Sequence, residues 1–130
     1  MAQQIKELTT KELADWIQQP EGILLDIRPL AAYNGWPLKD EPRGGHIKGA
    51  TAIPFKWTQY IDFKDIMDNK RITPEKTLVI YGYKRENTEW LANKLQGSGF
   101  ENVSVYHRFP DEWSSDQNLP MERLERYRQL

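Results

Sequence analysis

The sequence contains no cysteine among its 130 residues. Disulfide bonds, thiolate metal sites and a cysteine nucleophile are therefore excluded within this chain. The two histidines, His46 and His107, do not have the spacing of a metal site. We expect neither a metal nor another cofactor.

The chain also lacks a long apolar segment and an excess of one charge. No run approaches the roughly 20 apolar residues of a membrane-spanning helix, and the N-terminus has no apolar centre like that of a signal peptide. The net charge of −1 at pH 7 gives no reason to expect binding to nucleic acid. We predict a globular domain with no transmembrane segment and no nucleic-acid partner; a cytoplasmic and a periplasmic location both stay open.

What the sequence does contain is an alternation of strand and helix patterns. Short apolar runs, typical of strands buried on both faces, occupy residues 22–27, 50–55, 77–82 and 102–107. Helical patterns occupy residues 10–19, 30–34, 56–70 and 86–100, the last with Gly97 or Gly99 able to end it, and a further helix starts near 110. Thr9 and Glu12 have the spacing of a capping box for the first helix, and Asn87 or Thr88 can cap the fourth. The alternation predicts an α/β domain with a central parallel sheet of about five strands and helices on both faces.

The C-terminal segment differs in character from the rest. It ends in "LPMERLERYRQL", which is charged and amphipathic. We predict one domain over residues 1–114 and a connector or edge helix over residues 115–130.

Three ordered stretches resemble the rhodanese (sulfurtransferase) homology domain. The first is "LLDIRPLAAYNG…GGHIKGATAIP", the second is the strand, loop and helix that begin at "LVIYG" and end at "SGFENV", and the third is Trp113 after the last strand. Together they span nearly the whole chain in the family's order. The resemblance implies a three-layer rhodanese-like fold.

In active members of that family, a cysteine follows the central apolar strand and carries sulfur as a persulfide. It lies in a six-residue loop whose backbone N–H groups and following helix favour an anion. The corresponding loop here consists of Gly82, Tyr83, Lys84, Arg85, Glu86 and Asn87. Gly82 stands at the cysteine position, Arg85 replaces the mid-loop glycine, and Asn87 replaces the loop-ending arginine. The resemblance therefore implies a degenerate active-site loop without a nucleophile and without persulfide catalysis.

The same loop carries candidate anion-binding residues. Lys84, Arg85 and Thr88 lie where the loop meets its helix, and a helix N-terminus attracts anions. The alternative is a solvated basic loop whose N–H groups bind water or Glu86.

Two further groups of residues have open roles. Asp26, Arg28 and His46 lie where the rim of the sheet is expected, and a structural role as ion pair and turn residue competes with a catalytic one. Trp36 and Leu38 lie in a loop rich in proline and glycine. They form either an interface with another domain or a lid over their own rim.

The resemblance favours one function over the others. We predict a catalytically inactive domain of a multi-domain sulfurtransferase of the thiosulfate type, with a second, cysteine-bearing rhodanese domain after Leu130 in the same protein. The alternative is a stand-alone module that docks proteins or senses a small anion at the loop. The sequence offers no set of residues for catalysis without cysteine.

Overall fold

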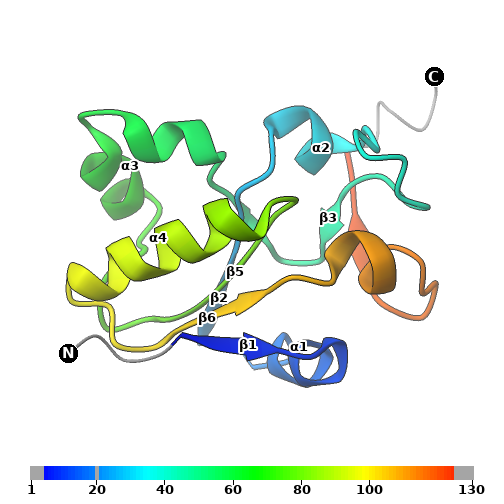
Figure 1. Ribbon diagram of the computed structural model, residues 1–130, viewed down its shortest axis with the longest axis horizontal. Coiled ribbons are helices and arrows are strands. Elements are labelled where there is room, and N and C mark those ends of the chain that lie inside the picture. Colours follow the sequence, from blue (N-terminus) through cyan, green and yellow to red (C-terminus); the bar gives the residue numbers. More distant parts are fainter. Residues whose placement is uncertain (1–4, 20, 125–130) are drawn as a thin grey trace.

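The computed structural model describes residues 5–19 and 21–124 of the chain. Its main sheet has five parallel strands in the spatial order β1-β6-β5-β2-β4 (Figure 1). These strands are β1 (Lys6–Leu8), β2 (Gly22–Asp26), β4 (Thr51–Ala52), β5 (Thr77–Tyr81) and β6 (Val103–Tyr106). A second, antiparallel sheet pairs β3 (His46–Ile47) with β7 (Met121–Glu122).

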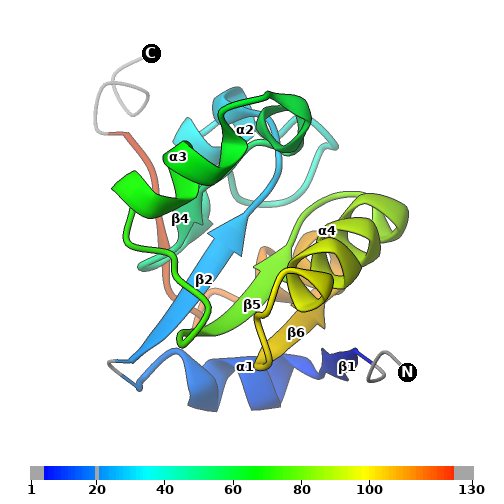
Figure 2. The same cartoon turned by 90° about the vertical axis from the view of Figure 1, so that its left-hand side faces the viewer.

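Helices cover both faces of the main sheet (Figures 1 and 2). α3 (Phe63–Asn69) and α4 (Arg85–Gly97) cover the face that buries Leu25 and Ile80. α1 (Thr10–Trp16) and a short π-helix, η2 (Phe109–Trp113), cover the face that buries Leu24 and Val79. Because successive strand residues point to opposite faces, the apolar runs of β2 and β5 supply both cores. The predicted three-layer α/β fold is confirmed.

The first helix begins as the sequence predicts. The amide of Glu12 donates to Thr9 Oγ1 over 3.1 Å, and the amide of Thr9 donates to Glu12 Oε1 over 2.9 Å. Such a cap contributes about 1 kcal/mol to helix stability. Strand β1, which directly precedes it, was not predicted, because three residues with two exposed charges show no apolar pattern.

The helix predicted over 56–70 is interrupted. A 3₁₀ helix, η1 (Phe55–Gln59), ends before Tyr60, whose backbone is extended, and α3 begins only at Phe63. Ile61, between them, is fully exposed, with a relative exposure of 106%. The predicted continuous helix over residues 56–70 is therefore wrong between Gln59 and Phe63. The remaining helix, α2 (Leu30–Asn34), matches its prediction. Within the described ranges, no helix is long and apolar enough to cross a membrane.

The described part of the C-terminal segment is not an edge helix. Met121 and Glu122 form β7, and Trp113 Nε1 donates to the carbonyl of Pro120 over 3.1 Å. Leu119 and Met121 pack against the same core cluster as α1. The expected edge helix is therefore wrong up to Leu124, because this segment forms β7 and its apolar side chains are partly buried against the domain. The alternative, a connector to a further domain, stays a prediction. Residues 125–130 lie outside the described residues, and the boundary near residue 114 stays a prediction.

Candidate functional site

The candidate site lies at the carboxyl ends of β2, β4 and β5. Residues 82–84 connect β5 to α4, and residues 85–87 already form the first turn of that helix. The six-residue loop predicted over 82–87 is therefore only three residues long. Lys84 is the N-cap of α4 and provides no side-chain cap, so the predicted capping by Asn87 or Thr88 is also wrong.

Gly82 is buried, and the space for a side chain there is occupied. A Cβ atom on Gly82 would lie 2.8 Å from Ile27 Cγ1 and 3.6 Å from Thr88 Oγ1. A carbon–carbon distance of 2.8 Å is well inside van der Waals contact. The position that would hold the nucleophile therefore lacks a cysteine, and the side chain of Ile27, just after β2, occupies the space for one.

The three candidate anion-binding residues have separate surroundings. Arg85 Nη1 donates to Glu7 Oε1 over 3.0 Å and to Glu89 Oε1 over 3.3 Å, and the hydrogen bond from Arg85 lowers the pKa of Glu7. Thr88 is buried and donates its hydroxyl to the Lys84 carbonyl over 3.1 Å. Of these three residues, only Lys84 lines a cavity that lies between the loop, the end of β2 and the start of η1. Anion binding by all three residues together remains an untested prediction with little geometric support.

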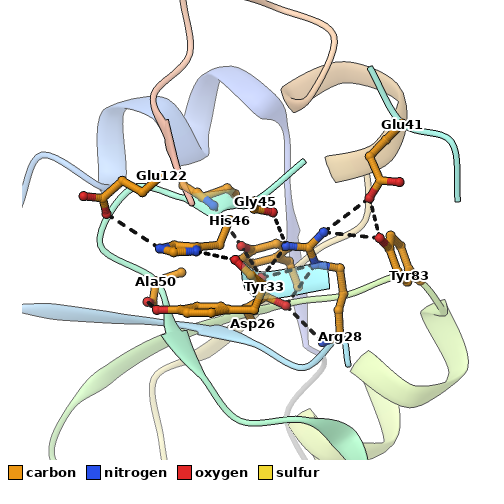
Figure 3. A network of polar contacts seen from close by, with 11 residues as sticks. Asp26, Arg28, Tyr33, Glu41, Gly45, His46, Ala50, Tyr83 and Glu122 are labelled. Atoms are coloured by element: carbon orange, nitrogen blue, oxygen red, sulfur yellow. Dashed lines mark hydrogen bonds and ion pairs between the residues drawn. The ribbon is translucent and has the colours of Figure 1, made fainter. Parts of the chain in front are cut away.

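A buried ion network lies next to the loop (Figure 3). Arg28, with a relative exposure of 1%, donates from Nη2 to Asp26 Oδ2 over 2.7 Å and to the carbonyl of Gly45 over 2.5 Å. Its Nη1 lies 3.4 Å from Glu41 Oε2. Tyr83 donates its hydroxyl to the same Glu41 carboxylate. One guanidinium therefore holds together the end of β2, the loop before β3 and the residue after Gly82.

The pKa of Arg28 and of two tyrosines in the network is raised; the second tyrosine, Tyr81, donates its hydroxyl to Asp26 Oδ2 over 2.6 Å. Burial alone would lower the pKa of Arg28, but the charge and hydrogen bonds of Asp26 outweigh it and raise that pKa. Burial, followed by the negative charge of Asp26, raises the pKa of the Tyr81 phenol. Burial and the hydrogen bond to Glu41 raise the pKa of Tyr83. The tyrosines thus stay protonated as hydrogen-bond donors, so none of them is a base at neutral pH.

His46 lies in β3 and not in a turn, so the expected turn position is wrong, because its segment pairs with Glu122 of β7. Its Nδ1 is 2.8 Å from the carbonyl oxygen of Tyr33, and its ring stacks on the Tyr33 ring at a centroid distance of 3.7 Å. Its Nε2 lies 3.7 Å from Glu122 in β7 (Figure 3). These contacts join β3 to its neighbours, and a structural role for His46 stays a prediction.

The two candidate interface residues are half exposed. Trp36 and Leu38 each have a relative exposure of 49%, and Leu38 also lines the cavity beside the loop. Their predicted role as an interface remains untested.

Sequence reasoning missed one of the two acidic members of the network, Glu41. Glu41 lies in the Pro- and Gly-rich segment before β3, where a charged residue is ordinarily solvated, yet it is 5% exposed. No local pattern marks it, because its partners Arg28 and Tyr83 are distant in sequence. Among the described residues, no group of three or more His, Cys, Asp or Glu side chains could hold a metal ion.

The sequence match agrees with this scaffold. Residues 9–116 match the rhodanese-like domain family, and the chain therefore belongs to that family. Its five-stranded parallel sheet with helices on both faces agrees with the assignment.

Several longer proteins resemble this chain. It is 26% identical over 117 residues to thiosulfate sulfurtransferase YnjE of Escherichia coli, an alignment that covers 88% of this chain and 27% of YnjE. The anaerobic ergothioneine biosynthesis enzyme from Chlorobium limicola, solved in complex with its natural substrate trimethyl histidine, matches with a TM-score of 0.91 and 40% identity over 98% of this chain and 30% of its own. An EanB structure with a cysteine persulfide and ergothioneine matches with a TM-score of 0.90 and 41% identity over 96% of this chain and 30% of that one. The chain thus spans less than a third of the length of these relatives.

We expect the substitution Arg28→Met to destabilise the domain by about 3–5 kcal/mol, because it leaves the buried carboxylates of Asp26 and Glu41 without their cation. Urea unfolding at pH 7 measures this change. Arg28→Lys keeps the charge but not the bidentate hydrogen bonding, so its loss of stability should be smaller. The control Arg108→Met removes an exposed ion pair with Glu112 and should leave stability unchanged. A loss in Arg28→Met no larger than in this control would contradict the structural importance of the network.

We expect Gly82→Cys to destabilise the domain by about 1–3 kcal/mol, because its Cβ overlaps Ile27. In an Ile27→Ala background, the same glycine substitution should cost little, since the overlapping atom is gone. Urea unfolding under reducing conditions measures both differences. The matched control is Gly97→Cys, where an added Cβ meets nothing within 4 Å. Equal costs for Gly82→Cys in both backgrounds would show that Ile27 does not fill the nucleophile's position.

Proposed function

We propose that this chain is a catalytically inactive rhodanese-like domain that shapes the substrate cleft of a longer sulfurtransferase of the thiosulfate type. In this proposal, a second rhodanese-like domain in the same protein supplies the cysteine that carries sulfur. The relatives support the proposal, because one is a thiosulfate sulfurtransferase and another has been captured with a cysteine persulfide. Both are more than three times longer than this chain.

The observation that carries the proposal is the state of the Gly82 position. A rhodanese-like domain transfers sulfur by forming a persulfide on the cysteine of this loop, which requires a thiolate. Here the position has no side chain, and Ile27 occupies the space in which one would begin. Because Ile27 packs into this space, restoring the cysteine alone would not restore the family's active-site geometry, and this supports an inactive domain.

The remaining scaffold supports a role at a domain interface. The Arg28 network rigidly joins the segments that form the rim, and Trp36 and Leu38 are half exposed on the adjoining loop. Half-exposed aromatic and aliphatic side chains beside a cavity are typical of surfaces that pack against another domain. In the proposed cleft, this rim faces the cysteine-bearing domain and limits which substrates reach it.

The direct test is a sulfur-transfer assay on two proteins. With thiosulfate as donor and cyanide as acceptor, this chain alone should form no thiocyanate above the buffer rate and should gain no sulfur atom in its intact mass. The full product of its natural gene should show turnover, and a Cys→Ser substitution in its other rhodanese-like domain should abolish that turnover. A sulfurtransferase that has its cysteine serves as the positive control.

Two results would overturn the proposal in different ways. Turnover by this chain alone would contradict its inactivity. A natural gene product without a cysteine-bearing rhodanese-like domain would contradict the cleft role and would favour the stand-alone docking or anion-sensing module.

A further inference from the structure

A cavity of about 560 Å³ lies beside the shortened loop. Its walls come from the end of β2, the loop around Leu38, the start of η1, and the junction of residues 83–87 with α4. Much of the lining is apolar and includes Ile27, Leu30, Leu38, Pro54 and Phe55. A volume of this size and character suits a small organic molecule, since ligand pockets span about 300–1,000 Å³.

Three lysines give this cavity a positive charge. Lys39, Lys56 and Lys84 line it, and no carboxylate side chain is among its lining residues. Within residues 5–19 and 21–124, none of the three ammonium groups has an ion pair. This local excess of positive charge contrasts with the chain's net charge of −1. It favours binding of an anion at the mouth of the cavity.

The fourth cation of the lining, Arg28, is already neutralised. Its guanidinium binds the carboxylates of Asp26 and Glu41. Both carboxylates therefore pair with Arg28 and not with the lysines. The positive charge available to a ligand comes from the three lysines.

The N-terminus of α4 adds to this field. The helix has 13 residues, and the side chain of its N-cap residue makes no capping hydrogen bond. Its N-cap residue Lys84 and its first-turn residue Asn87 both line the cavity. Unpaired amide N–H groups at a helix N-terminus attract an anion over a short range.

We propose that this cavity binds an organic anion with an apolar body, such as an aryl or branched-alkyl carboxylate or sulfonate. The anionic group lies among Lys39, Lys56 and Lys84, and the apolar body covers Ile27 and Phe55. The site shares Lys84 with the one predicted at the loop but differs from it otherwise, because neither Arg85 nor Thr88 lines the cavity. It does not depend on any role of the domain in sulfur transfer.

Three probes separate the two halves of the proposed recognition. Naphthalene-1-sulfonate has the charge and the apolar body, naphthalene-1-sulfonamide has only the body, and methanesulfonate has only the charge. Titrations followed by backbone amide NMR should give saturable shifts with the first probe at Ile27, Phe55, Lys56, Tyr83 and Lys84. The other two probes should bind at least about tenfold more weakly.

Lysine variants test the contacts themselves. The triple variant Lys39→Gln, Lys56→Gln, Lys84→Gln should bind naphthalene-1-sulfonate at least about tenfold more weakly. The matched control Lys11→Gln, Lys48→Gln, Lys76→Gln removes the same charge outside the cavity and should change binding by less than about twofold. Because all these substitutions replace one flexible polar side chain by another, circular dichroism should report a folded domain in each case.

The outcomes are distinct. Equal binding of the sulfonamide would show an apolar pocket without anion recognition, and equal losses in the two lysine variants would show a general charge effect. Shifts outside the cavity residues, or no saturable shifts, would also overturn the proposal. None of these results depends on the sulfur-transfer assay, so the site and the proposed function can fail separately.

Discussion

The rest of this structure depends on how one buried cation is paired. A guanidinium cannot be removed from water without carboxylate and carbonyl partners, because the desolvation cost would be several kcal/mol. Arg28 finds these partners in Asp26 at the end of β2, and in Glu41 and the carbonyl of Gly45 on the loop before β3. Tyr83 joins the network through Glu41. Segments far apart in sequence are thereby held at the carboxyl edge of the sheet, where ligands of α/β domains bind.

At this edge of the sheet, the chain keeps the rhodanese-like architecture but has a glycine, Gly82, at the position of the family's cysteine. The strand, helix and rim around Gly82 keep the architecture of a rhodanese-like domain. The side chain of Ile27 fills the place where a nucleophile would start, and Arg85 pairs with Glu7 and Glu89. Three lysines without ion pairs in the described chain, Lys39, Lys56 and Lys84, line an adjoining and largely apolar cavity. In our proposals, this edge binds a ligand and shapes a cleft, and it does not carry sulfur.

Much of the fold followed from local patterns, whereas most of the site did not. The capping box of Thr9 and Glu12 and the apolar strand β5 were predicted correctly, because their signals lie within a few residues. Strand β1 is stabilised by pairing with β6, nearly 100 residues away, and carries no pattern of its own. Glu41 and the ion pair between Arg85 and Glu7 were missed for the same reason. The loop was predicted too long because the resemblance supplied its length, whereas α4 here begins at Arg85.

The central claim is that the Arg28 network acts as one unit, and a double-mutant cycle tests it most directly. The free energy of unfolding is measured by urea for the natural chain, Asp26→Asn, Arg28→Met and the double variant. Residues in direct contact within one ion network show coupling energies of about 0.5–3 kcal/mol. Our account predicts a value near the upper end, since neither partner can be solvated alone. Additive effects within about 0.5 kcal/mol would contradict it.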